Sequence, residues 1–308
     1  MQHGFHRVPV AILFILSIIL AACAPSTPEN TSSTPLKVVA VESFLADITR
    51  NVAGERVMVS SLVQEGMDPH TFEPTPRDII MISESRLLIV NGAGLESWLD
   101  AMLDQKSIDI PVITASSGLT PRRPSSAELV DEPIDPHFWL DPTHVITYTQ
   151  NIRDGLITMD PAGRDVYEMN AEAYITQLQD LDRWITTQVD QIAPEDRMLV
   201  TNHESFGYFA DRYGFEIIGT IIPSVSSGST PTALQLTGLI EKIQYAKVKA
   251  IFLEAGSNPE LAQTIASETG VTIVTGLLTH SLTGPDGPAD TYIDMMKYDT
   301  QLIVDALK

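Results

Sequence analysis

Strand-like and helix-like segments alternate along most of the chain, and this alternation limits the fold more than any other feature. Short apolar runs are separated by longer amphipathic stretches, the pattern of parallel sheets covered by helices. The expected strands are 37–41, 57–63, 86–90, 112–114, 198–201, 216–222, 250–253 and 271–274. The sequence therefore predicts an α/β chain with two lobes, each built on a mainly parallel sheet flanked by helices.

A long helix-forming segment joins the two sets of strands. Between residues 162 and 192, apolar side chains such as Val166, Met169 and Leu178 recur mostly three to five positions apart. This spacing predicts one helix of about 31 residues, about 45 Å long at about 1.5 Å per residue. Such a helix is longer than a lobe is wide, so it should run along both. The expected parts are an N-terminal lobe, a linking helix and a C-terminal lobe, at 36–160, 161–193 and 194–308.

Helix starts are marked by a polar residue followed by proline, because proline at the first helical position sacrifices no hydrogen bond. We expect helices to begin at Thr75-Pro76, Asp141-Pro142, Asp160-Pro161, Thr230-Pro231 and Asn258-Pro259.

The first 22 residues predict a signal peptide. Arg7 precedes an apolar run at 11–20 that is too short for a permanent transmembrane helix. The following Leu-Ala-Ala-Cys resembles the lipobox of bacterial lipoproteins, in which the cysteine, here Cys23, is lipidated and becomes the new N-terminus. A plain secretory signal is the alternative. Cys23 is the only cysteine, which excludes an intramolecular disulfide. Residues 23–35 are rich in Pro, Ser and Thr and predict a disordered tether.

The charge balance excludes one large class of partners. Lys and Arg number 19 against 40 Asp and Glu, a net charge of −21, so no basic face is available for nucleic acid. Such acidity suits a soluble, self-repelling surface or one that meets cations. We expect a monomer.

Four histidines follow expected strands or lie in loops: His70, His137, His203 and His280. Imidazole is the commonest zinc ligand, and sites of this kind are assembled from dispersed residues. His144 lies inside an expected helix, where a structural role is favoured.

The stretches around these histidines resemble the zinc and manganese substrate-binding proteins of bacterial ABC transporters, called cluster 9 or cluster A-I. The resemblance runs from about Leu36 to the C-terminus and rests on 66–75, 91–99, 135–142, 203–209, 213–214, 252–254 and 292–298. It implies two lobes joined by a long helix, a metal ion buried in the cleft, and delivery of that ion to a membrane permease.

Carried over residue by residue, the resemblance implies metal ligands at His70, His137 and His203, with His280 in the fourth position. The third position is histidine in zinc members and glutamate in manganese members, so His203 implies the zinc type. The fourth position is normally an acid, and His280 departs from that pattern. The His- and Asp-rich loop of many zinc members is not matched, because the stretch 116–135 contains no histidine.

The ligand types can also be weighed by their chemistry. Manganese prefers oxygen ligands, whereas zinc accepts four nitrogens in a tetrahedron; copper and nickel also accept imidazole and stay open. Four neutral ligands leave the charge of the dication unbalanced unless nearby acids offset it, and Asp68, Glu204 and Glu254 are candidates. If His280 pointed away, one of these acids, Asp286 or a water would be the fourth ligand.

We therefore expect an extracytoplasmic, high-affinity zinc-binding lipoprotein that is anchored in the membrane lipid through Cys23 and delivers its ion to an ABC transporter permease. A manganese or other transition-metal member is one alternative, and a lipoprotein adhesin on the same fold is another. A zinc hydrolase with Glu204 as base is disfavoured, because the chain has no His-Glu-x-x-His motif and four ligands leave no open coordination position. The chain is thus not expected to be an enzyme.

Overall fold

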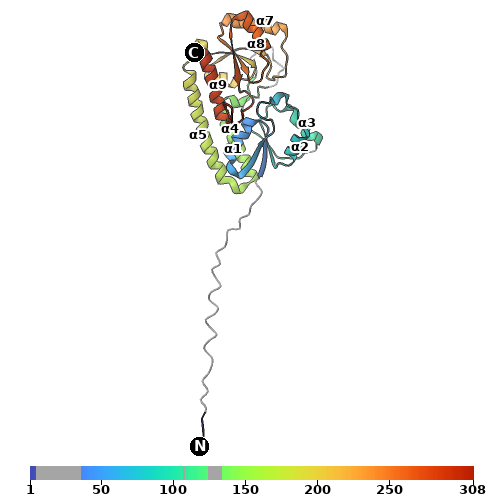
Figure 1. Cartoon of the computed structure of the whole chain (residues 1–308), viewed down its shortest axis with the longest axis vertical. Coiled ribbons are helices and arrows are strands. Elements are labelled where there is room, and N and C mark those ends of the chain that lie inside the picture. The colour runs from blue at the N-terminus through green and yellow to red at the C-terminus, as the bar shows by residue number, and fades with distance from the viewer. Residues whose placement is uncertain (5–35, 107, 124–133) are drawn as a thin grey trace. The chain divides into compact units, whose positions relative to one another are not determined.

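The computed structural model describes residues 1–4, 36–106, 108–123 and 134–308 (Figure 1). The predicted lipobox, Cys23 and the tether lie outside these residues, as does most of the predicted signal peptide. Within the described part of the chain, no helix combines the length and apolar character needed to cross a membrane.

The strands of the described residues form two parallel four-stranded sheets. The N-terminal sheet has the order β2-β1-β3-β4, and the C-terminal sheet has the order β6-β5-β7-β8. Their bounds are β1 Leu36–Ala40, β2 Val57–Ser61, β3 Leu87–Val90, β4 Val112–Thr114, β5 Met198–His203, β6 Glu216–Ile222, β7 Ala250–Glu254 and β8 Thr272–Leu277. The predicted two-lobed α/β fold is confirmed.

Both sheets share one topology, and it decides where a ligand can bind. In each, the chain turns back between the first strand and the third, so β1 and β3 flank one reversal and β5 and β7 flank the other. Ligands of parallel α/β sheets bind beyond the carboxyl ends of strands at such reversals.

Helices cover the sheets and join the lobes. They are α1 Ser43–Ala53, α2 Pro76–Ser83, α3 Ser97–Lys106, α4 Pro142–Met159, α5 Arg164–Val189, α6 Gly207–Tyr213, α7 Ala233–Ala246, α8 Glu260–Thr269 and α9 Tyr292–Leu307. Helix α5 packs against α1 and α4 and also against α9, so it runs along both lobes (Figure 1).

Helix α5 is shorter than predicted, with 26 residues, about 39 Å at about 1.5 Å per residue. Residues 161–163 form a separate 3-10 turn, and the carboxylate of Asp160 binds Arg56 and Tyr167 rather than capping that turn. The buried face also differs from the predicted one at its start. Tyr167 and Tyr174 are buried, whereas Met169 is 63% exposed.

The predicted helix starts hold at two places, Thr75-Pro76 and Asp141-Pro142, and shift at three. Helix α8 begins at Glu260, one residue later than predicted. The carboxylate of Asp141 accepts a hydrogen bond from the Thr143 N–H, as an N-cap should. Helix α7, however, begins at Ala233 with Thr232 as its N-cap, because Thr232 rather than Thr230 forms the capping box with Gln235. At Asp160 the proline opens the 3-10 turn instead of the helix itself.

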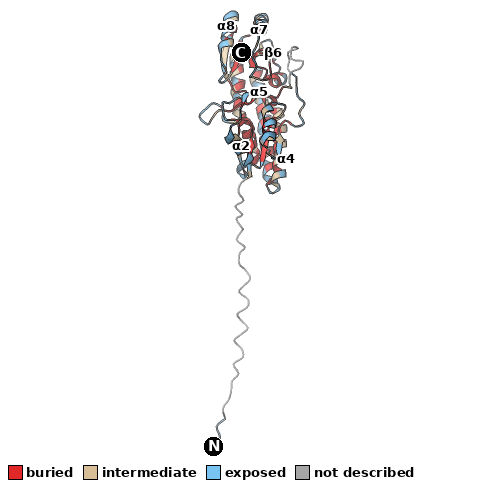
Figure 2. Cartoon of the chain, turned by 90° about the vertical axis from the view of Figure 1, so that its right-hand side faces the viewer, coloured by how far each residue is buried: buried red, intermediate tan, exposed pale blue. Residues whose placement is uncertain are grey.

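One apolar core is shared by both lobes. It runs from Phe44 and Trp139 through Leu178 on α5 to Phe252 and Met295, while two smaller clusters lie under the remaining helices of each sheet. Figure 2 shows buried residues through the middle of both lobes and exposed residues on the outer helices. The shared core holds the carboxyl ends of the two sheets against one another.

Candidate metal centre

The four predicted histidines come from four different parts of the fold, each at the end of a strand, in a loop or in a short turn. His203 is the last residue of β5, and His280 lies in the loop after β8. His70 lies in the 3-10 turn Pro69–Thr71, whose start is held by the Asp68 carboxylate accepting from the His70 N–H at 2.9 Å. His137 immediately precedes the turn Phe138–Leu140. Two histidines therefore come from each lobe.

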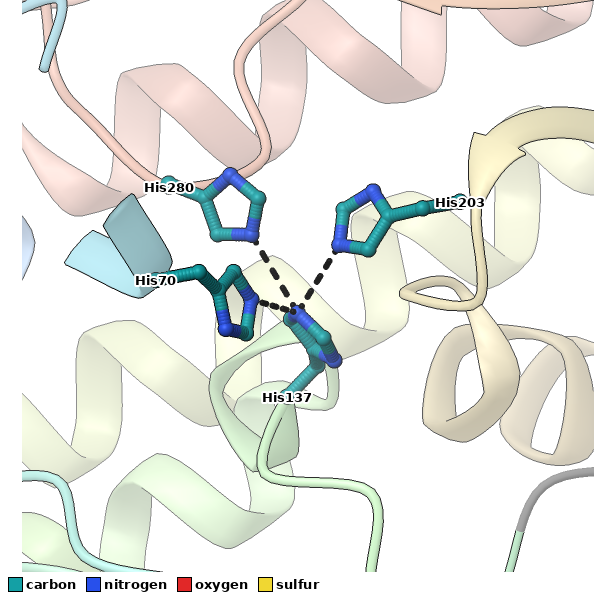
Figure 3. A group of neighbouring side chains, drawn as sticks. All are labelled: His70, His137, His203 and His280. Carbon is teal, nitrogen blue, oxygen red and sulfur yellow. Dashed lines mark hydrogen bonds between the residues drawn. The ribbon is translucent and has the colours of Figure 1, made fainter. Parts of the chain in front are cut away.

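The fold brings all four imidazoles together around His137 (Figure 3). The Nε2 atom of His137 lies 3.2 Å from that of His70, 3.2 Å from that of His280 and 3.3 Å from that of His203. One ligand atom from each residue lies within 4.8 Å of all the others. In a tetrahedron with metal–nitrogen bonds of about 2.0 to 2.1 Å, neighbouring nitrogens are about 3.3 to 3.4 Å apart. The observed spacing suits one small ion.

Two of the rings have their outer nitrogens bound to carboxylates. The Nδ1 atom of His137 lies 2.8 Å from Oδ1 of Asp135, and that of His203 is hydrogen-bonded to Oε1 of Glu254. These partners assign the ring protons to Nδ1, which leaves a lone pair on each Nε2. Lone pairs that face one another across 3.3 Å repel unless a proton or a metal cation lies between them. The four rings could therefore hold a metal ion.

Charged groups surround the imidazoles. Arg122 lies 3.3 Å from Asp135 and 3.0 Å from Asp211 on α6, so the Asp135 charge is partly balanced by a guanidinium. Glu254 lies 3.7 Å from Nδ1 of His280 in addition to its bond to His203. Among the described residues, no carboxylate belongs to the group of possible ligands. Asp286, one of the predicted alternatives, is exposed in its loop.

His144 does not join the site. It lies in α4, and its ring packs edge-on against Phe138 and Tyr208. The structural role expected for it agrees with this position.

Two supporting residues were not singled out from the sequence. Asp135 orients His137, and Arg122 contacts Asp135 from the far side. The Asp135-Pro-His137 spacing carried a signal, because a carboxylate two residues before a ligand can reach its ring. Arg122 carried none, since Asp135 is 13 residues away and Asp211 is 89 residues away, with no local pattern that links them.

A family model now places the chain. The model for the periplasmic zinc-uptake complex component A, ZnuA, matches residues 38–306. The chain belongs to this family. The manganese-binding lipoprotein MntA of Halalkalibacterium halodurans is 33% identical over 298 residues, which cover 96% of this chain and 97% of MntA. The manganese ABC transporter substrate-binding lipoprotein PsaA of Streptococcus pneumoniae is 31% identical over 307 residues, covering 96% of this chain and 97% of PsaA.

A solved structure of the same kind agrees in fold. The periplasmic zinc-binding protein TroA of Treponema pallidum superposes with a TM-score of 0.80 at 25% identity, covering 89% of this chain and 99% of TroA. Of these relatives of the ZnuA-family chain, MntA is described as a manganese-binding lipoprotein, PsaA as the substrate-binding lipoprotein of a manganese ABC transporter, and TroA as a periplasmic zinc-binding protein.

Burial keeps three of the four imidazoles in their neutral form. It lowers the pKa of His70 to about 4, with the charge of His203 adding to the effect. Burial also holds the pKa values of His137 and His280 well below their usual range. At His203 burial works in the same direction, but the charge and hydrogen bond of Glu254 outweigh it and raise the pKa. Near neutral pH, an arriving cation therefore meets three imidazoles that carry no competing proton.

A cavity of about 710 Å³ adjoins the ligand set and is lined by His280 and by segments from both lobes. Glu65, Asp68, Glu254 and Glu260 contribute to its walls. A cavity with acidic walls raises the local concentration of cations. Of the four imidazoles, that of His280 lines this cavity.

Proposed function

We propose that this chain is the extracytoplasmic, membrane-anchored substrate-binding lipoprotein of an ABC transporter, with zinc as the ion that it hands to the permease. His70, His137, His203 and His280 are the proposed ligands. Membership of the ZnuA family and the described functions of MntA and PsaA support the transport role. They also speak for a binding protein over the hydrolase considered from the sequence.

The observation that carries zinc as the cargo is the donor set. Four imidazole nitrogens converge, and no carboxylate oxygen stands among them in the described residues. Zinc binds four nitrogens readily in a tetrahedron, whereas manganese favours oxygen donors and six-fold coordination.

Manganese is the second candidate, because both MntA and PsaA are described as manganese proteins. The zinc-binding protein TroA is similar over 89% of the chain, against 96% for MntA and PsaA. The choice between the two ions therefore rests on the ligand chemistry of this chain and on measurement.

The remaining parts of the proposal concern the organisation of the chain. We infer a signal peptide at 1–22, a tether at 23–35 beginning with lipidated Cys23, lobes at 36–160 and 194–308, and a linking segment at 161–193. We also infer a monomer, in keeping with the net charge of −21.

The experiment is a competition titration of the mature chain, purified without added metal, against zinc, manganese, copper and nickel. We expect one zinc per chain and a Kd for zinc at least 100-fold below that for manganese, about 2.7 kcal/mol. His137→Ala should lose most of the affinity, while His144→Ala, a histidine outside the site, should bind as the wild type does. Tighter binding of manganese than of zinc would overturn the assignment.

A further inference from the structure

Glu254 occupies a place that the sheet order makes special. Strand β7 lies between β5 and β8. Its carboxyl end is therefore flanked by the end of β5, which carries His203, and by the end of β8, which leads to His280. A bulge sits at this point: Leu253 pairs with Thr275, but Glu254 pairs with Leu277. The extra residue in β8 is Gly276, whose φ of 101° favours glycine. The bulge sets how Glu254 is placed relative to the loop of His280.

The Glu254 carboxylate faces the outer nitrogens of two proposed ligands. Its Oε1 accepts a hydrogen bond from Nδ1 of His203, and its Oε2 lies 3.7 Å from Nδ1 of His280. The side chains of His203 and His280 are 0% and 6% exposed, and that of Glu254 is 10% exposed. These interactions therefore act with little screening by water.

Glu254 also differs from Asp135, the other carboxylate that is hydrogen-bonded to a ligand ring. Asp135 shares its charge with Arg122, whereas the ion pairs of Glu254 within the described residues are with His203 and His280 alone. Four neutral ligands leave both charges of a divalent ion to be balanced from outside the ligand set. Glu254 is the carboxylate best placed to do so.

We propose that Glu254 is a positioning residue that serves two ligands at once, holding His203 and His280 with Nε2 toward the ion and supplying negative charge behind both rings. This inference rests on the proposed function, since it requires these histidines to bind a metal. It goes further by assigning one carboxylate to the geometry of half the ligand set.

The test compares Glu254→Gln with Glu260→Gln in the mature chain. Both changes remove one charge from the same cavity wall, but of these two residues only Glu254 forms ion pairs with the ligand rings, those of His203 and His280. Loss of a group that orients metal ligands costs about 10- to 100-fold in affinity. We expect Glu254→Gln to raise the zinc Kd by that factor and Glu260→Gln to change it by less than about threefold.

Two further readouts separate positioning from a general structural effect. Cobalt(II) absorption reports ligand geometry, and we expect altered visible bands in Glu254→Gln but not in Glu260→Gln. In the His280→Ala background, Glu254→Gln should cost clearly less than in the wild type, because one of its two targets is already gone. Glu254→Asp, which keeps the charge but is too short to reach both rings, should be intermediate and serves if the glutamine variant does not fold.

The outcomes distinguish this inference from the proposed function. Wild-type protein that binds zinc tightly, together with Glu254→Gln or Glu254→Asp that binds zinc and cobalt just as the wild type does, overturns the role of Glu254 alone. Wild-type protein that binds no divalent metal overturns both.

Discussion

The indole nitrogen of Trp139 donates a hydrogen bond to the carbonyl oxygen of Thr279 at 2.8 Å. Trp139 lies two residues after His137, and Thr279 immediately precedes His280, so this bond ties together ligand segments from the two lobes. The Trp139 ring is fully buried and stacks on Phe44 with ring centroids 4.4 Å apart. Trp139 therefore packs in the core and also links the segments that carry His137 and His280.

Replacing this indole tests the link between the two segments. Trp139→Phe keeps an aromatic ring but leaves the Thr279 carbonyl without its donor and opens a small cavity. We expect a loss of at least about 2 kcal/mol in the free energy of unfolding, and a severalfold weaker zinc affinity. Denaturant titration and zinc competition measure the two effects. Trp184→Phe, on α5 and away from the site, is the control, and equal zinc affinities in the two variants would contradict the role of Trp139.

His280 is one of the four proposed ligands, and its Nε2 atom lies 3.2 Å from that of His137. We expect His280→Ala to weaken zinc binding at least tenfold, about 1.4 kcal/mol. His280→Asp should keep zinc and improve manganese binding, because a carboxylate lowers the net charge and supplies an oxygen donor. A zinc-bound crystal structure with the His280 nitrogens well beyond about 2.1 Å from the ion, together with unchanged zinc affinity in His280→Ala, would remove His280 from the ligand set.

Asp299 predicts a pH dependence of stability in the metal-free protein. Burial raises the pKa of Asp299 to about 8, opposed by a hydrogen bond that its Oδ1 accepts from the Leu278 N–H. The unfolded value is about 3.9, so the folded state holds the proton more tightly. This contribution to stability is fully present below about pH 3.9 and is lost as the pH rises toward 8, by about 1.4 kcal/mol per pH unit.

Asp299→Asn removes that titration while keeping the acceptor for the Leu278 N–H. We expect the unfolding free energy of the variant, relative to wild type, to rise steadily between pH 5 and pH 8 in denaturant titrations. Asp305→Asn, an exposed site on the same helix, should show no such trend over this range. A variant that runs parallel to the wild type across these pH values would show that Asp299 is ionised throughout.

The lipid anchor is testable without reference to the metal. We expect the mature chain to be acylated at Cys23 and to partition with membranes, because two or more acyl chains bind a bilayer stably. Cys23→Ser should release the protein into the soluble fraction. Intact-mass spectrometry that finds an unmodified cysteine at the mature N-terminus would rule the anchor out.

Local sequence patterns were enough to predict the strands, most helices and the four candidate ligands. Apolar runs marked all eight described strands to within a few residues, since strand formation and capping depend on neighbours along the chain. The buried face at the start of the long helix differs from the predicted one. Tyr167 and Tyr174 rather than Val166 and Met169 face the core, because which face of a helix is buried depends on what packs against it.

The convergence of the four histidines depends on the packing of the whole chain. His70 and His280 lie at distant points of the sequence, and no local pattern states that their rings converge on His137. The proposed role of Glu254 depends on the order of the strands. The contacts of Arg122 with Asp135 and Asp211 depend on how separate segments of the chain pack together. Distance and orientation between such groups follow from the shared core and from hydrogen bonds between the lobes, such as that of Trp139 with Thr279, because both link the two sheets.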